Sequence, residues 1–320
     1  MLAIIIPYYK LTFFEAALQS LASQTNQQFK VYIGDDASPE NPLLLLEKFR
    51  GKFDFTYHRF EENLGGISLP EQWKRCIALS SNEEWIMILG DDDVLSAKVV
   101  ESFYDNLPEI QTERINTVRF ATQIIDENGT EITEVFHHPI REKTTEFLIK
   151  KFSKETRSSL SEYIFNKKVL VEKSFRNFPL AWHSDDMAFL EFSNFGNCYS
   201  IKDSIMFVRT SAINITGDTS FNNLKNKATF EFCAILFDEY SNMFSNEQKR
   251  VILKKLEMAF FNIPSIANYR ILFFYYWNQL GTKATVGFQI HMLRIVIILA
   301  LKKVKLFDFV QSIHSKIYQK

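Results

Sequence analysis

The chain has 320 residues with 37 Lys and Arg against 38 Asp and Glu, a formal net charge of -1. This balance excludes a whole-chain positive field that recruits nucleic acid, and the length allows one large core, or one core with an appendage. The three cysteines form no CxxC pair and indicate reduced structural thiols. The chain enters an apolar run at Leu2 without a signal-peptide pattern, so we expect a cytoplasmic protein.

Short apolar runs alternate with helical patterns near the start of the chain. We expect strands at Leu2–Ile6, Phe29–Ile33, Phe53–His58 and from Trp85, and helices at Phe13–Ser23, Leu43–Phe49 and about Leu69–Leu79. This alternation predicts an α/β fold with a parallel, right-handed, three-layer sheet. Such a topology suits nucleotide binding, but the absence of GxGxxG and of a P-loop argues against a dinucleotide dehydrogenase and a P-loop kinase.

Three consecutive aspartates, Asp91-Asp92-Asp93, follow the apolar strand that begins at Trp85. Ligands bind beyond the carboxyl ends of strands in an α/β sheet, and adjacent ionised carboxylates repel one another. Water and a helix N-terminus relieve that repulsion on a surface turn, whereas Mg²⁺ or Mn²⁺ relieves it in a site. The triplet alone leaves both interpretations open. We expect a helix over Ser96–Leu107, with Ser96 as its N-cap.

A second acidic group lies further along the chain, in Ser184-Asp185-Asp186. We expect Ser184 to be the N-cap of a helix running to about Asn194, which puts both aspartates in its first turn. They either complement the helix dipole or supply a general base. Before this group in the sequence we expect a β-hairpin joining 116–125 to 130–136 and a strand at 163–165, and after it a strand at 205–208.

Beyond Asn223 the sequence becomes helical and aromatic. From His291 to Lys320 there are six Lys or Arg and one acid, Asp308, and the longest uncharged run near the end, Ile295–Leu301, is too short to span a bilayer. A basic, apolar helix either lies on an anionic membrane surface or packs on the main domain or a second subunit. We expect domains at 1–222 and 223–320, the first divided at about residue 110 into nucleotide-binding and acceptor halves.

From about Met1 to Gly217 the chain resembles a family 2 glycosyltransferase of the GT-A fold. The motifs are Pro7-x-Tyr9, Ser20-Leu21-x-Ser23-Gln24-Thr25, Asp35-Asp36-x-Ser38, Asn63-x-Gly65, the "DxD" loop Asp91-Asp92-Asp93, and Ser184-Asp185-Asp186. The resemblance implies a mainly parallel twisted sheet flanked by helices, with a helical C-terminal extension. It also implies metal-dependent transfer from a nucleotide sugar, a UDP-sugar by preference, to a hydroxyl of a surface glycan. The basic C-terminal helices suit a lipid-linked acceptor and docking at the inner face of the plasma membrane.

The resemblance assigns the nucleotide-binding residues by position. Pro7 and Tyr9 line the nucleotide pocket, with Tyr9 against the base. Asp36 accepts a hydrogen bond from uracil and Asp35 supports its loop, while Asn63 lies near the nucleotide.

The same resemblance assigns the metal and the base. Asp91 contacts the ribose, and Asp92 binds Mg²⁺ or Mn²⁺ with Asp93 alongside. Asp186 takes the proton of the acceptor hydroxyl, with Asp185 as second choice, and direct displacement inverts the anomeric centre. Arg209 is the cationic candidate near this site, and it is either a phosphate contact or a surface salt-bridge residue.

The chain departs from the family pattern in having Asp185-Asp186 where a Glu-Asp pair is usual, with no arginine following in that helix. Two other functions remain open. A sugar nucleotidyltransferase also needs a Mg²⁺ carboxylate site, but it normally has a phosphate loop rich in Gly and Arg or Lys, and residues 7–10 are not one. A catalytically inactive nucleotide-sugar-binding or scaffold subunit is the non-enzyme alternative.

Overall fold

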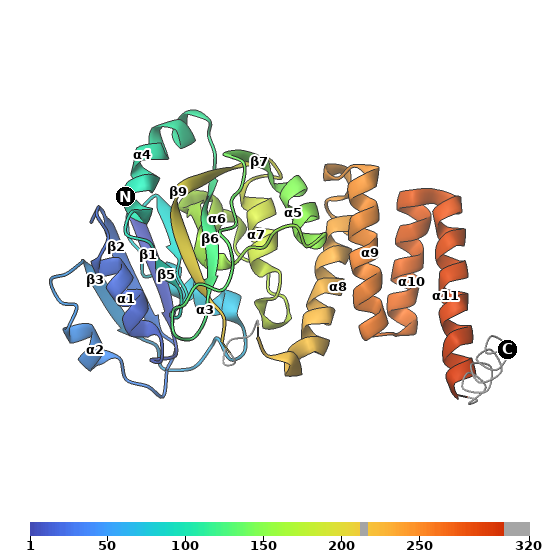
Figure 1. Cartoon of the computed structure of the whole chain (residues 1–320), viewed down its shortest axis with the longest axis horizontal. Helices are drawn as coiled ribbons and strands as arrows, with labels where there is room; N and C mark the ends of the chain where they lie inside the picture. Colours follow the sequence, from blue (N-terminus) through green and yellow to red (C-terminus); the bar gives the residue numbers. More distant parts are fainter. Residues whose placement is uncertain (212–216, 304–320) are drawn as a thin grey trace, which may run out of the picture. The chain divides into compact units, whose positions relative to one another are not determined.

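A computed structural model describes residues 1–211 and 217–303, with the backbone alone for 295, 296 and 298–303 (Figure 1). The chain divides into two compact units, Met1–Phe244 and Ser245–Lys320. Helix α8 (Asn222–Asp238), which we expected in the C-terminal helical region, belongs to the first unit.

The first unit is built on one sheet. Its strands are β1 (Leu2–Tyr8), β2 (Phe29–Asp35), β3 (Phe55–Arg59), β4 (Trp85–Ile88), β5 (Val94–Leu95), β6 (Thr117–Ile125), β7 (Arg141–Lys143), β8 (Tyr163–Asn166) and β9 (Asn197–Arg209). Their order is β3-β2-β1-β4-β8-β6-β9-β5, with β7 beside β9. The pairs β1–β2, β2–β3, β1–β4 and β6–β9 are parallel. The parallel sheet predicted from the alternation forms in β3-β2-β1-β4. The whole sheet is mixed, because β8 runs antiparallel between β4 and β6, and β5 and β7 are antiparallel to β9.

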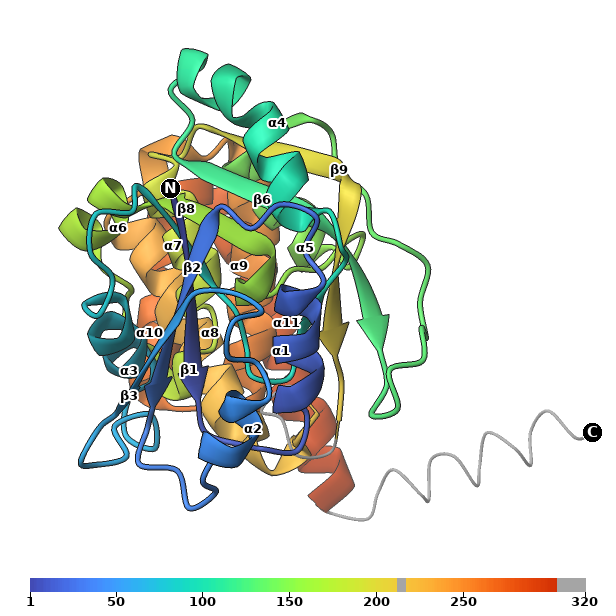
Figure 2. The same ribbon diagram turned by 90° about the vertical axis from the view of Figure 1, so that its left-hand side faces the viewer.

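Helices cover both faces of this sheet. The helices of this unit are α1 (Phe14–Ala22), α2 (Leu43–Glu47), α3 (Leu69–Ile77), α4 (Val99–Thr112), α5 (Thr144–Phe152), α6 (Lys167–Lys173), α7 (Ser184–Phe192) and α8, with short 3₁₀ turns at η1 (Leu160–Glu162), η2 (Pro179–Ala181), η3 (Thr219–Phe221) and η4 (Ser241–Met243). Helix α8 lies beyond the layer that covers the sheet, where its Phe232 contacts Phe152 of α5 and His183. Figure 2 shows α1 and α3 on opposite sides of β1.

The apolar sequence of β1 explains this layering. Alternate residues of a strand point to opposite faces, so Leu2, Ile4 and Ile6 pack with α1 and α4, whereas Ala3 and Ile5 pack with α3. A strand covered on both faces is apolar throughout, as β1 is. We predicted that this strand ends at Ile6, but β1 continues through Pro7 to Tyr8, and these two residues pair with Gly34 and Asp35 of β2.

The helix after the acidic triplet begins later than predicted. Val94 and Leu95 pair with β9 as β5, and the Ser96 hydroxyl accepts a hydrogen bond from Ile205 N at 2.9 Å. Ser96 is therefore part of the sheet edge, and α4 starts at Val99 with Lys98 as its N-cap. The predicted N-cap at Ser184 is also wrong, because α7 starts at Ser184 itself, after His183 in the left-handed conformation, at φ 73°. The two aspartates lie in its first turn, as predicted.

The predicted hairpin forms only in part. The turn over 126–129 is present, with Gly129 at φ +84°. Its second arm, however, pairs with β6 only at two isolated bridges, Thr122 to Phe136 and Ile125 to Glu131.

The second unit consists of α9 (Asn246–Asn262), α10 (Ile266–Tyr275), the π-helical turn η5 (Tyr276–Leu280) and α11 (Gly281–Lys303). Ser245 and Gln248 form a capping box at the start of α9, and Ser265 caps α10. Among the helices of residues 1–211 and 217–303, none is both long and apolar enough to cross a bilayer.

Candidate functional site

A cleft of about 640 Å³ opens where β1, β2 and β4 end. Eight of the predicted site residues line it: Pro7, Tyr9, Asp36, Asn63, Asp91, Asp92, Asp93 and Arg209. Its other walls are Lys10, Phe13, Gly65, Gly66, Leu69, Gln72, Trp73, Ile88, Gly90, Ser159, Leu160, Ser161, Val208 and Phe221. The remaining predicted residues, Asp35, Asp185 and Asp186, do not line the cleft.

The three aspartates of the acidic loop have different surroundings. Asp91 Oδ2 accepts hydrogen bonds from the backbone N–H groups of Tyr9 and Lys10, both at 2.8 Å, and so joins this loop to the end of β1. Asp93 is buried; Oδ2 accepts from the Ser161 hydroxyl and Oδ1 from Arg209 N at 2.9 Å. Asp92 lines the cleft between these two anchored carboxylates, where a ligand can reach it.

Gly90 brings two of these carboxylates together. A Cβ atom at Gly90 would lie 2.8 Å from Asp92 Oδ1 and 3.2 Å from Asp93 Oδ2, so both oxygens converge over the glycine. Burial and the charges of Asp93 and Asp91 raise the pKa of Asp92 to about 8. A cation relieves this repulsion by replacing the proton.

The donor set fits a hard cation that shares its coordination with a ligand. Within the described ranges no three His, Cys, Asp or Glu side chains gather into a complete metal-binding cluster. Mg²⁺ is commonly held by one or two carboxylates and substrate phosphates. Asp92 and Asp93 supply such a pair.

Arg209 is buried and fixes the geometry of the loop. Its Nε donates to the carbonyl of Asp92 at 3.0 Å, and its Nη1 donates to the carbonyl of Asp126 at 2.7 Å. The guanidinium lies 4.6 Å from the ring centre of Phe13. Of the two open interpretations, the surface salt bridge is therefore wrong, because Arg209 is buried and donates to backbone carbonyls.

Asp35 supports the loop that carries Asp36. Fully buried Asp35 accepts from Ser38 N at 2.8 Å and from the side chains of Tyr57 and Arg59. Asp36 itself lines the cleft.

Asp36 anchors a second loop. It accepts from Leu64 N and Gly65 N, each at 2.8 Å, and forms an ion pair with Arg75. A Cβ atom at Gly65 would lie 2.5 Å from Asp36 Oδ2. This position therefore requires glycine for the loop to close on the carboxylate.

The second acidic group, Asp185 and Asp186, has its own set of partners and does not line the cleft. Asp186 is 3% exposed, forms an ion pair with Lys151 and bonds to His183 Nδ1 at 2.7 Å. His183 Nε2 is bonded to the Thr229 hydroxyl of α8 at 2.9 Å. Asp185 is only partly buried; burial and the charge of Asp186 raise its pKa.

Residues 157–162 connect the two acidic groups, and sequence reasoning missed them. Ser161 bonds to Asp93 and accepts from Gly90 N at 3.1 Å. Glu162 completes a capping box with Ser159, and the Lys151 ammonium donates to the Ser158 hydroxyl at 2.8 Å as well as to Asp186. The Ser-x-x-Glu pattern signals this turn in the sequence, whereas Lys151 has no such signal.

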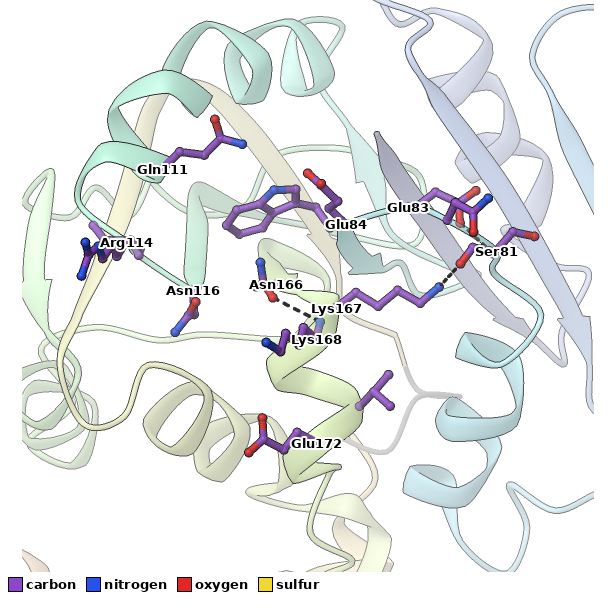
Figure 3. Close-up of a pocket in the computed structure, with 14 residues that line it drawn as sticks. Ser81, Glu83, Glu84, Gln111, Arg114, Asn116, Asn166, Lys167, Lys168 and Glu172 are labelled. Carbon is purple, nitrogen blue, oxygen red and sulfur yellow. Dashed lines mark hydrogen bonds between the residues drawn. The ribbon is translucent and has the colours of Figure 1, made fainter.

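A larger depression of about 820 Å³ lies at the other end of β4 (Figure 3). Figure 3 shows Lys167 reaching the carbonyl of Ser81, a hydrogen bond of 2.7 Å, below Glu84. None of the predicted site residues lines this depression. Size alone therefore does not identify the functional cleft.

Solved structures share the fold of this chain. Staphylococcus aureus TarS 1-349 in complex with UDP-GlcNAc matches with a TM-score of 0.63 at 14% identity, over 89% of this chain and 81% of that chain. Mannosyltransferase PcManGT from Pyrobaculum calidifontis in complex with GDP-Man and Mn²⁺ matches with a TM-score of 0.54 at 10% identity, over 92% of this chain and 80% of that chain. The predicted GT-A fold, a mainly parallel sheet flanked by helices with a helical C-terminal region, is confirmed.

Sequence comparison gives the family. The poly(ribitol-phosphate) beta-N-acetylglucosaminyltransferase TarS of S. aureus (strain Mu50 / ATCC 700699) is 25% identical over 142 residues, 41% of this chain. The match spans 24% of that relative's length. Residues 3–161, which contain Asp36, Asn63 and the acidic triplet, match the family model Glycosyl transferase family 2. Through these residues the chain belongs to glycosyl transferase family 2.

Proposed function

We propose that this protein is an inverting, metal-dependent glycosyltransferase. It moves a sugar from a nucleotide sugar, a UDP-sugar, to a hydroxyl of a cell-surface glycan or lipid-linked acceptor at the cytoplasmic face of the plasma membrane. The observation that carries the proposal is the pair of carboxylate oxygens from Asp92 and Asp93 that converge over Gly90 inside the cleft. Support comes from the related folds, whose solved structures hold UDP-GlcNAc and UDP in TarS and GDP-Man with Mn²⁺ in PcManGT.

On the donor side, Tyr9 lies against the base, Asp36 accepts from the uracil ring, and Asp91 contacts the ribose. Asn63, also in the cleft wall, lies near the nucleotide, and Pro7 shapes its floor. Asp92 and Asp93 are the residues that hold Mg²⁺ or Mn²⁺, which when bound offsets the negative charge of the departing diphosphate. The buried Arg209 orients this loop through Asp92 and supplies positive charge beside it.

On the acceptor side, a carboxylate must take the proton of the attacking hydroxyl. The hydroxyl oxygen bonds to the anomeric carbon while the bond from that carbon to the diphosphate breaks, so the centre inverts. We assign the base to Asp185, because the carboxylate oxygens of Asp186 are both engaged by Lys151 and His183. Asp186 and Lys151 position the first turn of α7.

One observation favours the alternative of an inactive nucleotide-sugar-binding subunit. The carboxylate that occupies the family's base position, Asp186, is tied in a buried ion pair. A binding subunit keeps donor affinity without turnover. The transferase releases nucleoside diphosphate when it is supplied with both donor and acceptor.

The first experiment is a thermal-shift panel of UDP-, GDP-, CMP- and dTDP-sugars, with Mn²⁺ and with EDTA. We expect a shift with UDP-sugars that requires Mn²⁺ and is lost in Asp92→Ala. The control variant, Asp105→Ala, alters an exposed aspartate on α4 and should keep the full shift. No shift with any donor contradicts the proposed site, and a shift that survives EDTA contradicts metal dependence.

A further inference from the structure

The second unit exposes an apolar stripe along α11. Val286, Ile290, Leu293 and Ile297 are all exposed, Leu293 by 60%. Their spacings of four, three and four residues place them on one side of the helix.

A similar stripe runs along α10 and η5. Ile266, Phe273 and Trp277 are exposed, Trp277 by 52%, and Phe274 lies beside them. Arg270, also exposed, falls within the same stripe, four residues after Ile266 and three before Phe273. We call the two stripes together the α10–α11 surface.

The core of the unit lies on the other sides of these helices. Leu272, Tyr275 and Phe288 are buried, and the rings of Tyr276 and Phe288 stack with centres 4.5 Å apart. The apolar side chains of the α10–α11 surface therefore point away from a core that is already packed. Exposed apolar area of this extent marks an interaction surface.

The charge around this surface has one sign. Between Glu257 and Asp308 the sequence contains no acid and six cations, Arg270, Lys283, Arg294, Lys302, Lys303 and Lys305. Arg270, Lys283 and Arg294 are exposed and form no ion pair with any residue the structure describes. Glu257 turns inward, where it accepts from the Tyr276 hydroxyl at 3.1 Å and lies 3.6 Å from His291 Nε2.

We propose that the α10–α11 surface docks on a bilayer rich in anionic lipids. Its aromatic and aliphatic side chains lie at the headgroup level and its cations pair with lipid phosphates. A second copy is a poor occupant, because a two-fold contact brings the same patch of both copies together and here opposes two acid-free, basic surfaces. The inference deepens the membrane location in the proposed function but does not rest on the catalytic residues.

The test is co-sedimentation of the full chain with vesicles of phosphatidylcholine alone or with about one third phosphatidylglycerol. We expect binding to the anionic vesicles only, weakening as salt rises. Lys283→Gln with Arg294→Gln should weaken it about 25-fold, and Trp277→Ser with Leu293→Ser about tenfold or more. The control, Leu44→Ser with Val171→Ser, removes two apolar side chains of the first unit that are at least as exposed as Trp277 and should bind normally.

Tryptophan fluorescence gives a local readout. Vesicles should shift the emission to the blue in the wild type, and Trp277→Phe should abolish the shift while sedimentation persists. Equal binding to neutral and anionic vesicles, or no binding to either, overturns the proposal. So does a concentration-dependent dimer in sedimentation velocity that Trp277→Ser with Leu293→Ser dissolves, since a second copy then occupies the surface. None of these variants should alter the UDP-sugar thermal shift, so failure here is separate from failure of the catalytic site.

Discussion

Lys151 of α5 and Asp186 of α7 form a buried ion pair, with side chains 20% and 3% exposed. Burial alone would raise the pKa of Asp186, but the Lys151 ammonium and the His183 hydrogen bond outweigh it and hold that pKa well below its usual range. A carboxylate so held is a weak proton acceptor. The pKa of the neighbouring Asp185 is instead raised, by burial and by the charge of Asp186, which suits a general base.

Asp185→Asn should therefore lower turnover by about 10²–10⁴-fold, the usual range for removing a general base, without weakening donor binding. The measurement is the rate of UDP release, set beside the donor thermal shift. Asp186→Asn serves as the comparison and should act mainly on stability, because it removes the charge that pairs with the partly buried Lys151, a loss of about 1–3 kcal/mol in urea unfolding. An active Asp185→Asn beside an inactive but stable Asp186→Asn would return the base assignment to Asp186.

The affinity for Mn²⁺ should depend on pH through Asp92. Burial and the charges of Asp93 and Asp91 raise its pKa to about 8, so below that pH the cation must displace a proton. Apparent affinity should rise about tenfold per pH unit below pH 8 and level off above it. Calorimetric titration of Mn²⁺ between neutral and alkaline pH measures this slope. An affinity independent of pH would mean that Asp92 is not a ligand.

Without metal, Asp92→Asn should stabilise the protein at alkaline pH by about 1–2 kcal/mol. An acid whose folded pKa exceeds its unfolded value of about 3.9 holds more protons in the folded state between those two values, so stability falls as pH rises through that window. The amide removes this penalty and should flatten the curve of unfolding free energy against pH. Asp105→Asn, at an exposed position on α4, should leave the curve unchanged.

Gly65→Ala should weaken donor binding. The new Cβ atom would lie 2.5 Å from Asp36 Oδ2, so the loop must withdraw from the carboxylate, at about 1–3 kcal/mol. Titration of the nucleotide sugar and urea unfolding measure the two effects. Gly287→Ala is the opposite case, since no atom lies within 4 Å of its Cβ position and alanine favours the helix by about 0.5–1 kcal/mol. Unaltered donor affinity in Gly65→Ala would show that this loop does not form the nucleotide wall.

Local patterns in the sequence were enough to predict the first four strands and three helices. The continuous apolar run of β1 and the helical spacing of Phe14, Ala17, Leu18 and Leu21 are readable without tertiary information. The position of the acidic loop followed from the same patterns, because ligands bind where parallel strands end. The fold and the cleft wall made by residues 7–93 were therefore accessible from the chain alone.

The rest depends on contacts between distant segments. Val94 and Leu95 form a strand only because β9 pairs with them more than 100 residues later, at Phe207 and Met206. Lys151 becomes important only when α5 brings it to Asp186, and no spacing rule predicts that meeting. The position of Asp186 within its motif indicated this residue as the base. The neighbours of Asp185 and Asp186 decide which of the two carboxylates is able to take a proton.

The antiparallel direction of β8 allows the segment between β6 and β8 to vary without moving the rest of the sheet. Because Met87 of β4 pairs with Ile164 of an antiparallel neighbour, β8 begins at the edge of the sheet where β4 ends. The chain thus leaves that edge after Ile125 and comes back to it at η1, where Ser161 fastens it to Asp93. The entropic cost of closing a segment that is anchored at both ends grows only slowly with the length of the segment. Insertions or exchanges over residues 130–140 can therefore vary this segment while the carboxylates that follow β2 and β4 keep their places.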